Sequence, residues 1–300
     1  MTPWNKDSGF YGHGSVLEEI ERSTDPRLEA MRRAIRSARE VLGGFGWERE
    51  PGKEREKSRF IAALRARLPE PALRWLDAVA ALAGDDPAYG PLFGTGGVDG
   101  RLEFAKVFAE CLVSALDFVT TPRRGRRAEG SRGAGLRAAL FGDPEKGAAI
   151  RATGGLLAPA SVDAPNAAPG FIGAKRLNPW DYVLALEGAL LLAGGVAKRY
   201  GSASGRLAAF PFTVESASAG HASAGDEASR GEVWLPLWTR PMGLRELAHL
   251  FREGRAEWRR RQVARAADMA RAIATLGVDR GLAEFRRFGV QGRSGRSFLA

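Results

Sequence analysis

The sequence predicts a mainly α protein, with one or two helical domains around a buried central helix and a small antiparallel β ribbon. Three observations lead to this fold class. Residues 178–200 form a long apolar run with helix-end signals on both sides. Other segments, such as 26–42 and 101–119, repeat apolar residues at helical spacing. Only two short stretches, 207–215 and 232–238, have the aromatic and β-branched content typical of strands.

The run 178–200 is the expected central helix. Asn178 is a favourable N-cap, Pro179 suits the first turn, and Arg199 complements the helix dipole at the far end. Its leucines and valines point in all directions around the axis, which is typical of a buried helix. A membrane span is disfavoured, because Glu187 leaves an apolar stretch shorter than the roughly 20 residues that a bilayer requires. We expect Glu187 to be buried against an arginine or backbone N–H groups.

The other elements follow from periodicity and from breaks at Gly and Pro. We expect region 1–152 to be helical with Gly-rich and Arg-rich loops, and region 153–300 to hold the central helix, the β ribbon and basic C-terminal helices. Arg32, Arg33, Arg36 and Arg39 should cover the outer face of helix 26–42. The prolines at 211 and 236 should confine both strands to sheet edges. The remaining expected helices are 15–23, 52–68, 72–83, 101–119, 242–253 and 255–276.

Cysteine and histidine content limits the possible chemistry. One cysteine, Cys111, excludes an internal disulfide framework and favours a reducing, cytoplasmic environment. The three histidines, at 13, 221 and 249, are far apart and make no metal-ligand spacing. The polar N-terminal residues do not resemble a signal peptide. We therefore expect no metal, no cofactor and no membrane partner.

Positive charge is concentrated at one end of the chain. The net charge is +10, and residues 240–300 contain fourteen arginines and no lysine against six acidic residues. Arginine suits phosphates and base edges, because its guanidinium group is planar and bidentate. A polyanionic partner is the first hypothesis. An Arg-rich composition without a binding role is the alternative, and charge alone does not separate the two.

A Gly- and Pro-rich stretch at 85–100 is a second candidate contact. Backbone N–H groups at Gly96 and Gly97 could approach a phosphate closely. The stretch lacks the Gly-Lys-Ser/Thr of a P-loop, and Asp99 replaces the third glycine of a dinucleotide fingerprint. A structural turn in which Asp99 caps the next helix is the alternative interpretation.

The candidate nucleic-acid contacts are therefore arginines and two glycines. They lie on the Gly-rich loop after helix 101–119, on the basic face of helix 255–276 and among the C-terminal phenylalanines, which suits single-strand stacking. Each group could equally be a solvated basic surface or part of the core. The candidates are Gly96, Gly97, Arg123, Arg124, Arg126, Arg127, Arg132, Arg255, Arg259, Arg260, Arg261, Arg286, Arg287, Arg293 and Arg296.

Two other classes of function remain open. A metal-dependent nuclease would have to use acids such as Asp85, Asp86 and Asp99, but no hydrolase or metalloprotease motif accompanies them. A helical scaffold that touches only other proteins is the third possibility. We expect the protein not to be an enzyme.

Six segments, taken in order, resemble one family. Together they are similar to the large subunit of type I-G (formerly I-U) CRISPR interference complexes, the Csx-seventeen group, which is a counterpart of the Cas-eight subunits. Family members are longer, so the chain is expected to be an internal fragment. Lys6, Asp7 and Val98 depart from the glycines and the polar residue that the family's loops would have. The segments are PWNKDSGF (3–10), YGPLFGTGGVDGRLEF (89–104), NPWDYVLALEGALLLAGG (178–195), AAFPFTV (208–214), GEVWLPLW (231–238) and ATLGVDRGLAEFRRFGVQGRSGRSFLA (274–300).

The resemblance implies a non-catalytic role in antiviral defence. Such a subunit joins a guide-RNA complex with Cas-seven-type backbone and Cas-five/Cas-six-type subunits. It would help to recognise the protospacer-adjacent motif, bind double-stranded target DNA, stabilise the R-loop and recruit a helicase-nuclease transiently. In RNA-guided systems of this kind base pairing reads the sequence, while protein reads the short motif and the backbone.

Overall fold

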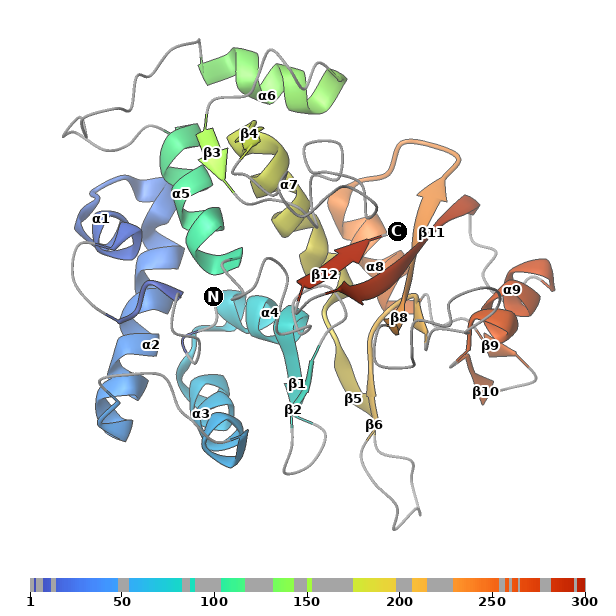
Figure 1. Ribbon diagram of the computed structural model, residues 1–300, viewed down its shortest axis with the longest axis horizontal. Coiled ribbons are helices and arrows are strands. Elements are labelled where there is room, and N and C mark those ends of the chain that lie inside the picture. The colour runs from blue at the N-terminus through green and yellow to red at the C-terminus, as the bar shows by residue number, and fades with distance from the viewer. Residues whose placement is uncertain are drawn as a thin grey trace. The chain divides into compact units, whose positions relative to one another are not determined.

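The fold is mainly helical with a small antiparallel sheet, as the sequence predicts (Figure 1). It is described from a computed structural model. The described residues form two compact units, 1–76 with 98–188 and 77–97 with 189–300. The division that the sequence predicts between residues 152 and 153 stays a prediction. The structure describes residues 3, 8–11, 15–47, 54–82, 87–89, 104–116, 132–142, 150–152, 175–197, 207–214, 229–253, 257–258, 261–263, 265–275, 282–293 and 296–299.

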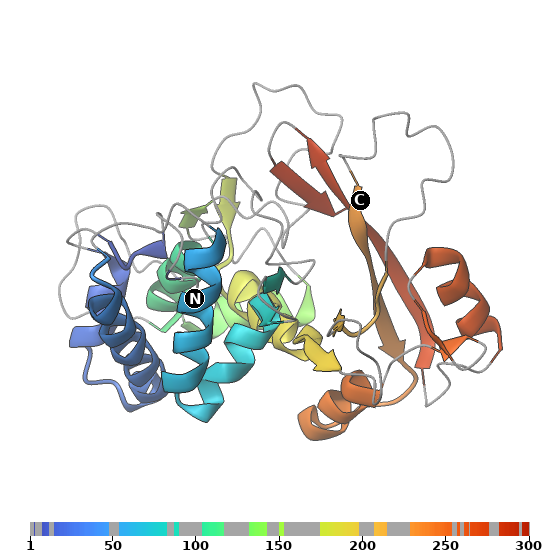
Figure 2. The ribbon, with the colours of Figure 1, turned by 90° about the horizontal axis from the view of Figure 1, so that it is seen from below.

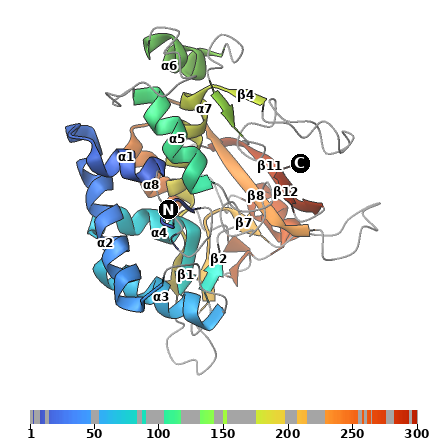
Figure 3. The same ribbon diagram turned by 60° about the vertical axis from the view of Figure 1, so that its left-hand side comes forward.

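The first unit is built from helices. Helix α1 packs against α2 and α5, α2 packs against α3, and α5 packs against α6. Figures 1 and 3 both show α1 and α2 side by side. Helices α4 and α7 each continue across a break between the units. The elements are α1 (Val16–Arg22), η2 (Pro26–Leu28), α2 (Glu29–Phe45), α3 (Glu54–Arg67), α4 (Glu70–Val79), α5 (Phe104–Leu116), α6 (Arg132–Phe141), β3 (Ile150–Ala152), β4 (Lys175–Leu177) and α7 (Pro179–Ala189).

The buried faces of these helices follow the predicted periodicity. In α2, Ile35, Ala38 and Leu42 are buried, and Gly46 ends the helix in the left-handed conformation at φ 63°. In α3, Phe60 is completely buried, and its ring lies 4.7 Å from that of Trp47. Burial of one such large side chain contributes roughly 1.5–3 kcal/mol, so these faces hold the helices together.

Asn178 begins α7 as predicted and also fastens α6. Its side-chain oxygen accepts a hydrogen bond from the Trp180 backbone N–H at 3.1 Å, which is the expected cap. Its amide nitrogen donates to the Gly135 carbonyl at 2.8 Å. A Cβ on Gly135 would lie 3.2 Å from the Trp180 ring, so glycine permits this close approach. Asn178 is 2% exposed and is therefore a buried polar link between two helices.

The central helix is shorter than the sequence predicts. It ends at Ala189 and is followed by the 3-10 turn η6 (Leu190–Leu192) and strand β5 (Gly195–Ala197). Glycine is required at position 194, because a Cβ there would lie 2.4 Å from the Phe210 ring. The predicted helix end at residues 198–200 lies outside the described residues.

Glu187 is not the buried acid that we expected. The residue is exposed, although desolvation by its surroundings raises its pKa and Arg74 partly offsets that effect. Tyr182, Val183 and Leu186 form the buried face of α7, whereas Leu184 is 37% exposed. The helix therefore has one buried face rather than apolar surroundings on all sides.

The second unit contains a four-stranded antiparallel sheet in the order β12-β11-β8-β7. In Figure 2 the orange β8 and the red β11 run side by side. Smaller two-stranded pairs are β1-β2, β5-β6 and β9-β10. The elements are β1 (Ala80–Leu82), β2 (Pro87–Tyr89), β6 (Leu207–Ala209), β7 (Thr213–Val214), β8 (Ser229–Trp238), α8 (Leu244–Glu253), β9 (Glu257–Trp258), β10 (Arg261–Gln262), α9 (Ala266–Ala274), β11 (Leu282–Arg293) and β12 (Arg296–Leu299), with η6 and β5 before them.

The predicted ribbon is present, but its strands differ from the prediction. Strand β7 pairs with β8 antiparallel, as expected, through Thr213 opposite Val233. The segment 207–215 is divided, because Phe212 adopts a positive φ of 50° between β6 and β7. The Phe212 ring is buried and packs 5.2 Å from Phe251 and 5.6 Å from Phe285, and this packing offsets the backbone strain.

Pro236 does not make β8 an edge strand. Strand β8 lies between β11 and β7, with Pro236 opposite Phe285. The Trp234 N–H donates to the Phe212 carbonyl on the β7 side, and N–H directions alternate along a strand. The position of a Pro236 N–H would face the same side, beyond the last β7 pairing at Val233. Its missing donor therefore breaks no ladder bond.

Two predicted helices are wrong in part. Segment 255–276 is not one helix: β9 and β10 form a hairpin, and the helix α9 follows them with Met269 buried. Segment 72–83 leaves the helix after Val79 and pairs as β1 with β2. In each case pairing with a neighbouring strand prevails over helical periodicity.

Replacing Asn178 tests the link between α6 and α7. We expect Asn178→Ala to lower the free energy of unfolding by about 2 kcal/mol, because it removes a helix cap and a buried amide bond. Asn178→Ser keeps a cap acceptor but loses the amide donor to Gly135, and it should cost about half as much. Urea denaturation of the full chain measures both. A cost for the alanine variant that is no larger than for an exposed substitution such as Ala30→Gly would contradict this role.

Candidate nucleic-acid interface

The structure places six of the candidate contact residues. Arg132 is the first residue of α6 rather than a loop residue, and Arg261 lies on strand β10 rather than on a long basic helix. The other four lie on strands β11 and β12, where the sequence predicted no strand: Arg286, Arg287, Arg293 and Arg296. The remaining candidates lie outside the described residues: Gly96, Gly97, Arg123, Arg124, Arg126, Arg127, Arg255, Arg259 and Arg260.

The β11–β12 hairpin therefore brings four candidate arginines onto one pair of strands. Arg293 and Arg296 stand at facing register positions, and Arg286 and Arg287 lie further along β11. Seven residues separate Arg286 from Arg293, which is about 23 Å along an extended strand. That length equals roughly seven nucleotide steps of a duplex strand at 3.4 Å each. The hairpin thus carries positive residues on the length scale of a nucleic-acid backbone.

Arg287 is anchored to the neighbouring strand by Glu232. Its Nε and Nη2 atoms donate to the two carboxylate oxygens at 2.8 and 2.6 Å, which is a bidentate pair. The Trp234 indole N–H donates to the same carboxylate at 3.1 Å, and the guanidinium carbon lies 5.5 Å from the Trp234 ring centroid. The Glu232 side chain is 3% exposed, whereas that of Arg287 is 52% exposed.

This arrangement fixes the register between β8 and β11. Hydrogen bonding to Glu232 raises the pKa of Arg287, so the guanidinium stays charged. Gly231 precedes the buried acid with a φ of 125°, and a Cβ there would lie 3.1 Å from the Val214 carbonyl. A glycine is therefore required where the strand turns its carboxylate inward. Arg287 thus has a structural partner that the sequence alone did not identify.

The sequence contained a signal for this partner. Glu232 is the one acid in an otherwise apolar strand segment, GEVWLPLW, and a buried carboxylate requires a charged or hydrogen-bonding partner. The identity of that partner was not accessible, because Arg287 lies 55 residues further along the chain.

Arg286 is differently placed from its neighbour. Its Nη2 lies 3.0 Å from Glu284, and the two side chains are 66% and 53% exposed. An exposed pair of this kind contributes at most about 1 kcal/mol. Arg286 can therefore exchange the Glu284 carboxylate for a phosphate at little cost. Arg287 cannot leave Glu232 without leaving a buried carboxylate unpaired.

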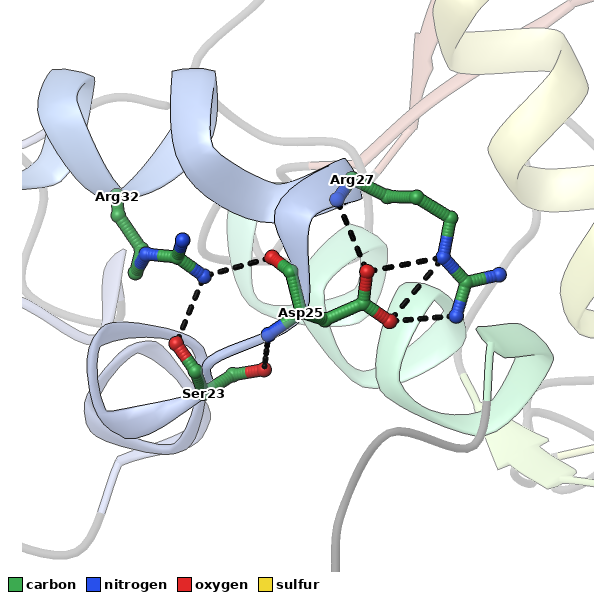
Figure 4. A network of polar contacts seen from close by, with 4 residues as sticks. All are labelled: Ser23, Asp25, Arg27 and Arg32. Carbon is green, nitrogen blue, oxygen red and sulfur yellow. Dashed lines mark hydrogen bonds and ion pairs between the residues drawn. The ribbon is translucent and has the colours of Figure 1, made fainter.

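Some arginines of the first unit also have internal roles. Figure 4 shows Arg32 donating through Nη1 to the Ser23 carbonyl at 2.7 Å and the Asp25 carbonyl at 2.8 Å. Arg32 is 7% exposed and also pairs with Glu29, so our expectation that it covers the outer face of its helix is wrong. Its guanidinium instead satisfies the carbonyls of the turn between α1 and η2.

Asp25 lies at the centre of the same turn. Its carboxylate accepts from the Arg27 backbone N–H at 2.9 Å and Nε at 3.0 Å (Figure 4). The hydrogen bonds from the Arg27 side chain and backbone lower the Asp25 pKa from 3.8 to about 2. The Arg27 guanidinium is thus paired with the Asp25 carboxylate within the turn.

The described residues contain no group of three His, Cys, Asp or Glu side chains arranged to hold a metal ion. Cys111 is buried in α5. The acids weighed as nuclease ligands, Asp85, Asp86 and Asp99, lie outside the described residues. None of the described helices has the length and apolarity that crossing a membrane requires.

Comparison with protein-family models gives no match for this chain, and comparison with curated proteins gives none either.

The buried pair predicts a specific stability pattern. We expect Arg287→Met to lower the free energy of unfolding by about 3 kcal/mol, because Glu232 is left buried and unpaired. The double variant Arg287→Met/Glu232→Gln should recover part of this loss. The adjacent, exposed Arg286→Met is the matched control and should change stability by less than about 0.5 kcal/mol. Equal urea midpoints for Arg287→Met and Arg286→Met would refute the anchoring role of Glu232.

The Asp25 turn predicts a pH dependence. A carboxyl whose folded pKa is about 2, against an ordinary value of 3.8, contributes stability above pH 4 and loses it as the pH falls toward 2. We expect the Asp25 carboxyl carbon to titrate by NMR near pH 2 and to return toward 3.8 in Arg27→Gln. Identical titration in the two proteins would show that Arg27 does not lower this pKa.

Proposed function

We propose that the chain is a non-catalytic, nucleic-acid-binding subunit of a type I-G CRISPR guide-RNA surveillance complex. In this role it contributes to recognition of the protospacer-adjacent motif, binds target DNA and stabilises the R-loop. Its partners are guide RNA, the Cas-seven-type and Cas-five/Cas-six-type subunits and, transiently, a helicase-nuclease. The ordered similarity of six segments supports the choice of complex.

The observation that carries the nucleic-acid role is the arginine arrangement on the β11–β12 hairpin. Arg287 secures the hairpin to β8 through Glu232. Arg286, Arg293 and Arg296 stand on the same two strands. A strand pair that is fixed by one arginine holds the backbone positions of the others at defined intervals, so phosphate contacts require less ordering than they would on a free loop. Phosphate neutralisation by arginine supplies affinity, and base pairing of the guide RNA supplies sequence choice.

Association with the complex tests the assignment. We expect the tagged chain to co-purify with a guide-RNA-loaded type I-G complex and to make duplex binding depend on the adjacent motif. Failure to associate, together with motif-independent binding that disappears at moderate salt, would overturn the assignment. Retention by partner subunits without any contribution to DNA binding would favour the protein-only scaffold. Cleavage that requires Mg²⁺ and Asp85 or Asp86 would favour the nuclease.

The hairpin arginines make a separate prediction. We expect the triple variant Arg286→Ala/Arg293→Ala/Arg296→Ala to reduce the slope of log K against log salt on duplex DNA by up to about 2.7, because each phosphate that is no longer neutralised removes about 0.9. The matched control replaces three exposed arginines of α1 and α2, in Arg22→Ala/Arg33→Ala/Arg36→Ala. Because the two variants have equal net charge, equal slopes would show that the hairpin makes no specific contact.

The Arg-rich loop is tested in the same assay. Replacing Arg123, Arg124, Arg126 and Arg127 by alanine should weaken DNA binding without changing the urea midpoint. Unchanged affinity at low salt would remove this loop from the interface.

A further inference from the structure

Helix α6 ends in an exposed aromatic side chain. Phe141 is 77% exposed, which is the largest value among the large hydrophobic residues described, and Leu140 before it is 56% exposed. Two adjacent, exposed apolar side chains of this size are uncommon on a surface that has no binding role. Neither residue was identified as a candidate from the sequence.

The position of Phe141 is defined by the packing of α6. Asn178 holds the helix at the Gly135 carbonyl, and Ala138 is buried one turn later. The chain leaves the helix at Gly142, whose φ is 82° and whose N–H donates to the Ala138 carbonyl at 2.9 Å. Phe141 therefore stands on the last turn of an anchored helix with a glycine end, rather than on a frayed terminus.

A positive charge accompanies the ring. Arg137, one helical turn earlier, places its guanidinium carbon 5.6 Å from the Phe141 ring centroid. Arg137 is itself exposed. Segment 132–141 contains two arginines and no acid, and residues 123–132 contain five arginines. The sequence that precedes the ring is therefore strongly basic, whereas Asp143 and Glu145 follow it.

We propose that Phe141 is a stacking platform for an unpaired base of single-stranded nucleic acid, with Arg137 contacting the adjacent phosphate. The Arg137 guanidinium lies over one face of the ring, so the other face can take a base while the arginine supplies a charge for the backbone. The occupant is a single strand rather than a duplex, because paired bases are stacked on their own neighbours. The proposal rests on the proposed function only in requiring that this chain meets an opened strand.

The ring and its neighbouring charge favour this occupant over others. A lipid surface or an apolar groove of a partner protein would also accept Leu140 and Phe141, but neither requires a π face. The choice between these occupants can therefore be tested by changing the chemistry of the side chain at 141 while its apolar character is kept.

The experiment uses the full chain and Phe141→Leu, Phe141→Trp and Leu140→Ala. Binding is measured by fluorescence anisotropy to a labelled single strand of about 20 nucleotides, long enough for one binding site, to the same strand with abasic sites, and to its duplex. We expect Phe141→Leu to bind the intact strand about tenfold more weakly, the loss typical of one stacked base. It should match the native chain on the abasic strand and on the duplex. Phe141→Trp should bind at least as well as the native chain, and Leu140→Ala should change little.

Several results would overturn the proposal. Equal affinity of the native chain and Phe141→Leu for the intact strand would show that no base stacks on the ring. An equal loss on the intact and abasic strands would show that the substitution acts on the fold. Binding to phosphatidylglycerol vesicles that Phe141→Leu retains, without a single-strand defect, would identify a lipid surface instead. If the native chain bound no nucleic acid, the proposed function would fail together with this inference. If the native chain bound nucleic acid and Phe141→Leu bound it equally well, only this inference would fail and the hairpin interface would still stand.

Discussion

The buried carboxylate of Glu232 is the constraint on which the four-stranded sheet depends. A charge that is 3% exposed is tolerated only with hydrogen-bond donors on both oxygens, and Arg287 and Trp234 supply them. Arg287 comes from β11 and Trp234 from β8, so the carboxylate is satisfied only when these two strands are in register. Gly231 allows the backbone to turn at this point. The β11–β12 hairpin is thereby fixed to β8 and to the rest of its unit.

This constraint separates the arginines by role. Arg287 and Arg32 are committed to acids and carbonyls within the fold, and their charge contributes little to a partner. Arg286 and Arg137 are exposed, and either can bind a phosphate without leaving a buried acid unpaired. The number of arginines alone overstates the basic surface, because several of them are paired with acids within the fold. A few well-placed arginines on anchored elements are sufficient for phosphate contacts.

Local signals predicted the helices and their caps, whereas strand pairing was less accessible. The Asn178 cap and the buried face of α2 depend on residues within a few positions of each other. Segment 282–293 was not expected to be a strand, yet it pairs with β8 through residues far away in the chain. The same limit applied to the site, where the basic residues were visible in the sequence but the internal partner of Arg287 was not. The exposure of Phe141 likewise follows from packing rather than from any motif.

Photo-crosslinking tests the central claim most directly. The complex would be assembled with guide RNA and a target duplex that carries 4-thiothymidine, irradiated, digested, and its crosslinked peptides identified by mass spectrometry. We predict crosslinks within residues 282–299 that decline when Arg286, Arg293 and Arg296 are replaced. Crosslinks confined to the partner subunits, with this chain retained in the complex, would contradict a nucleic-acid-binding role.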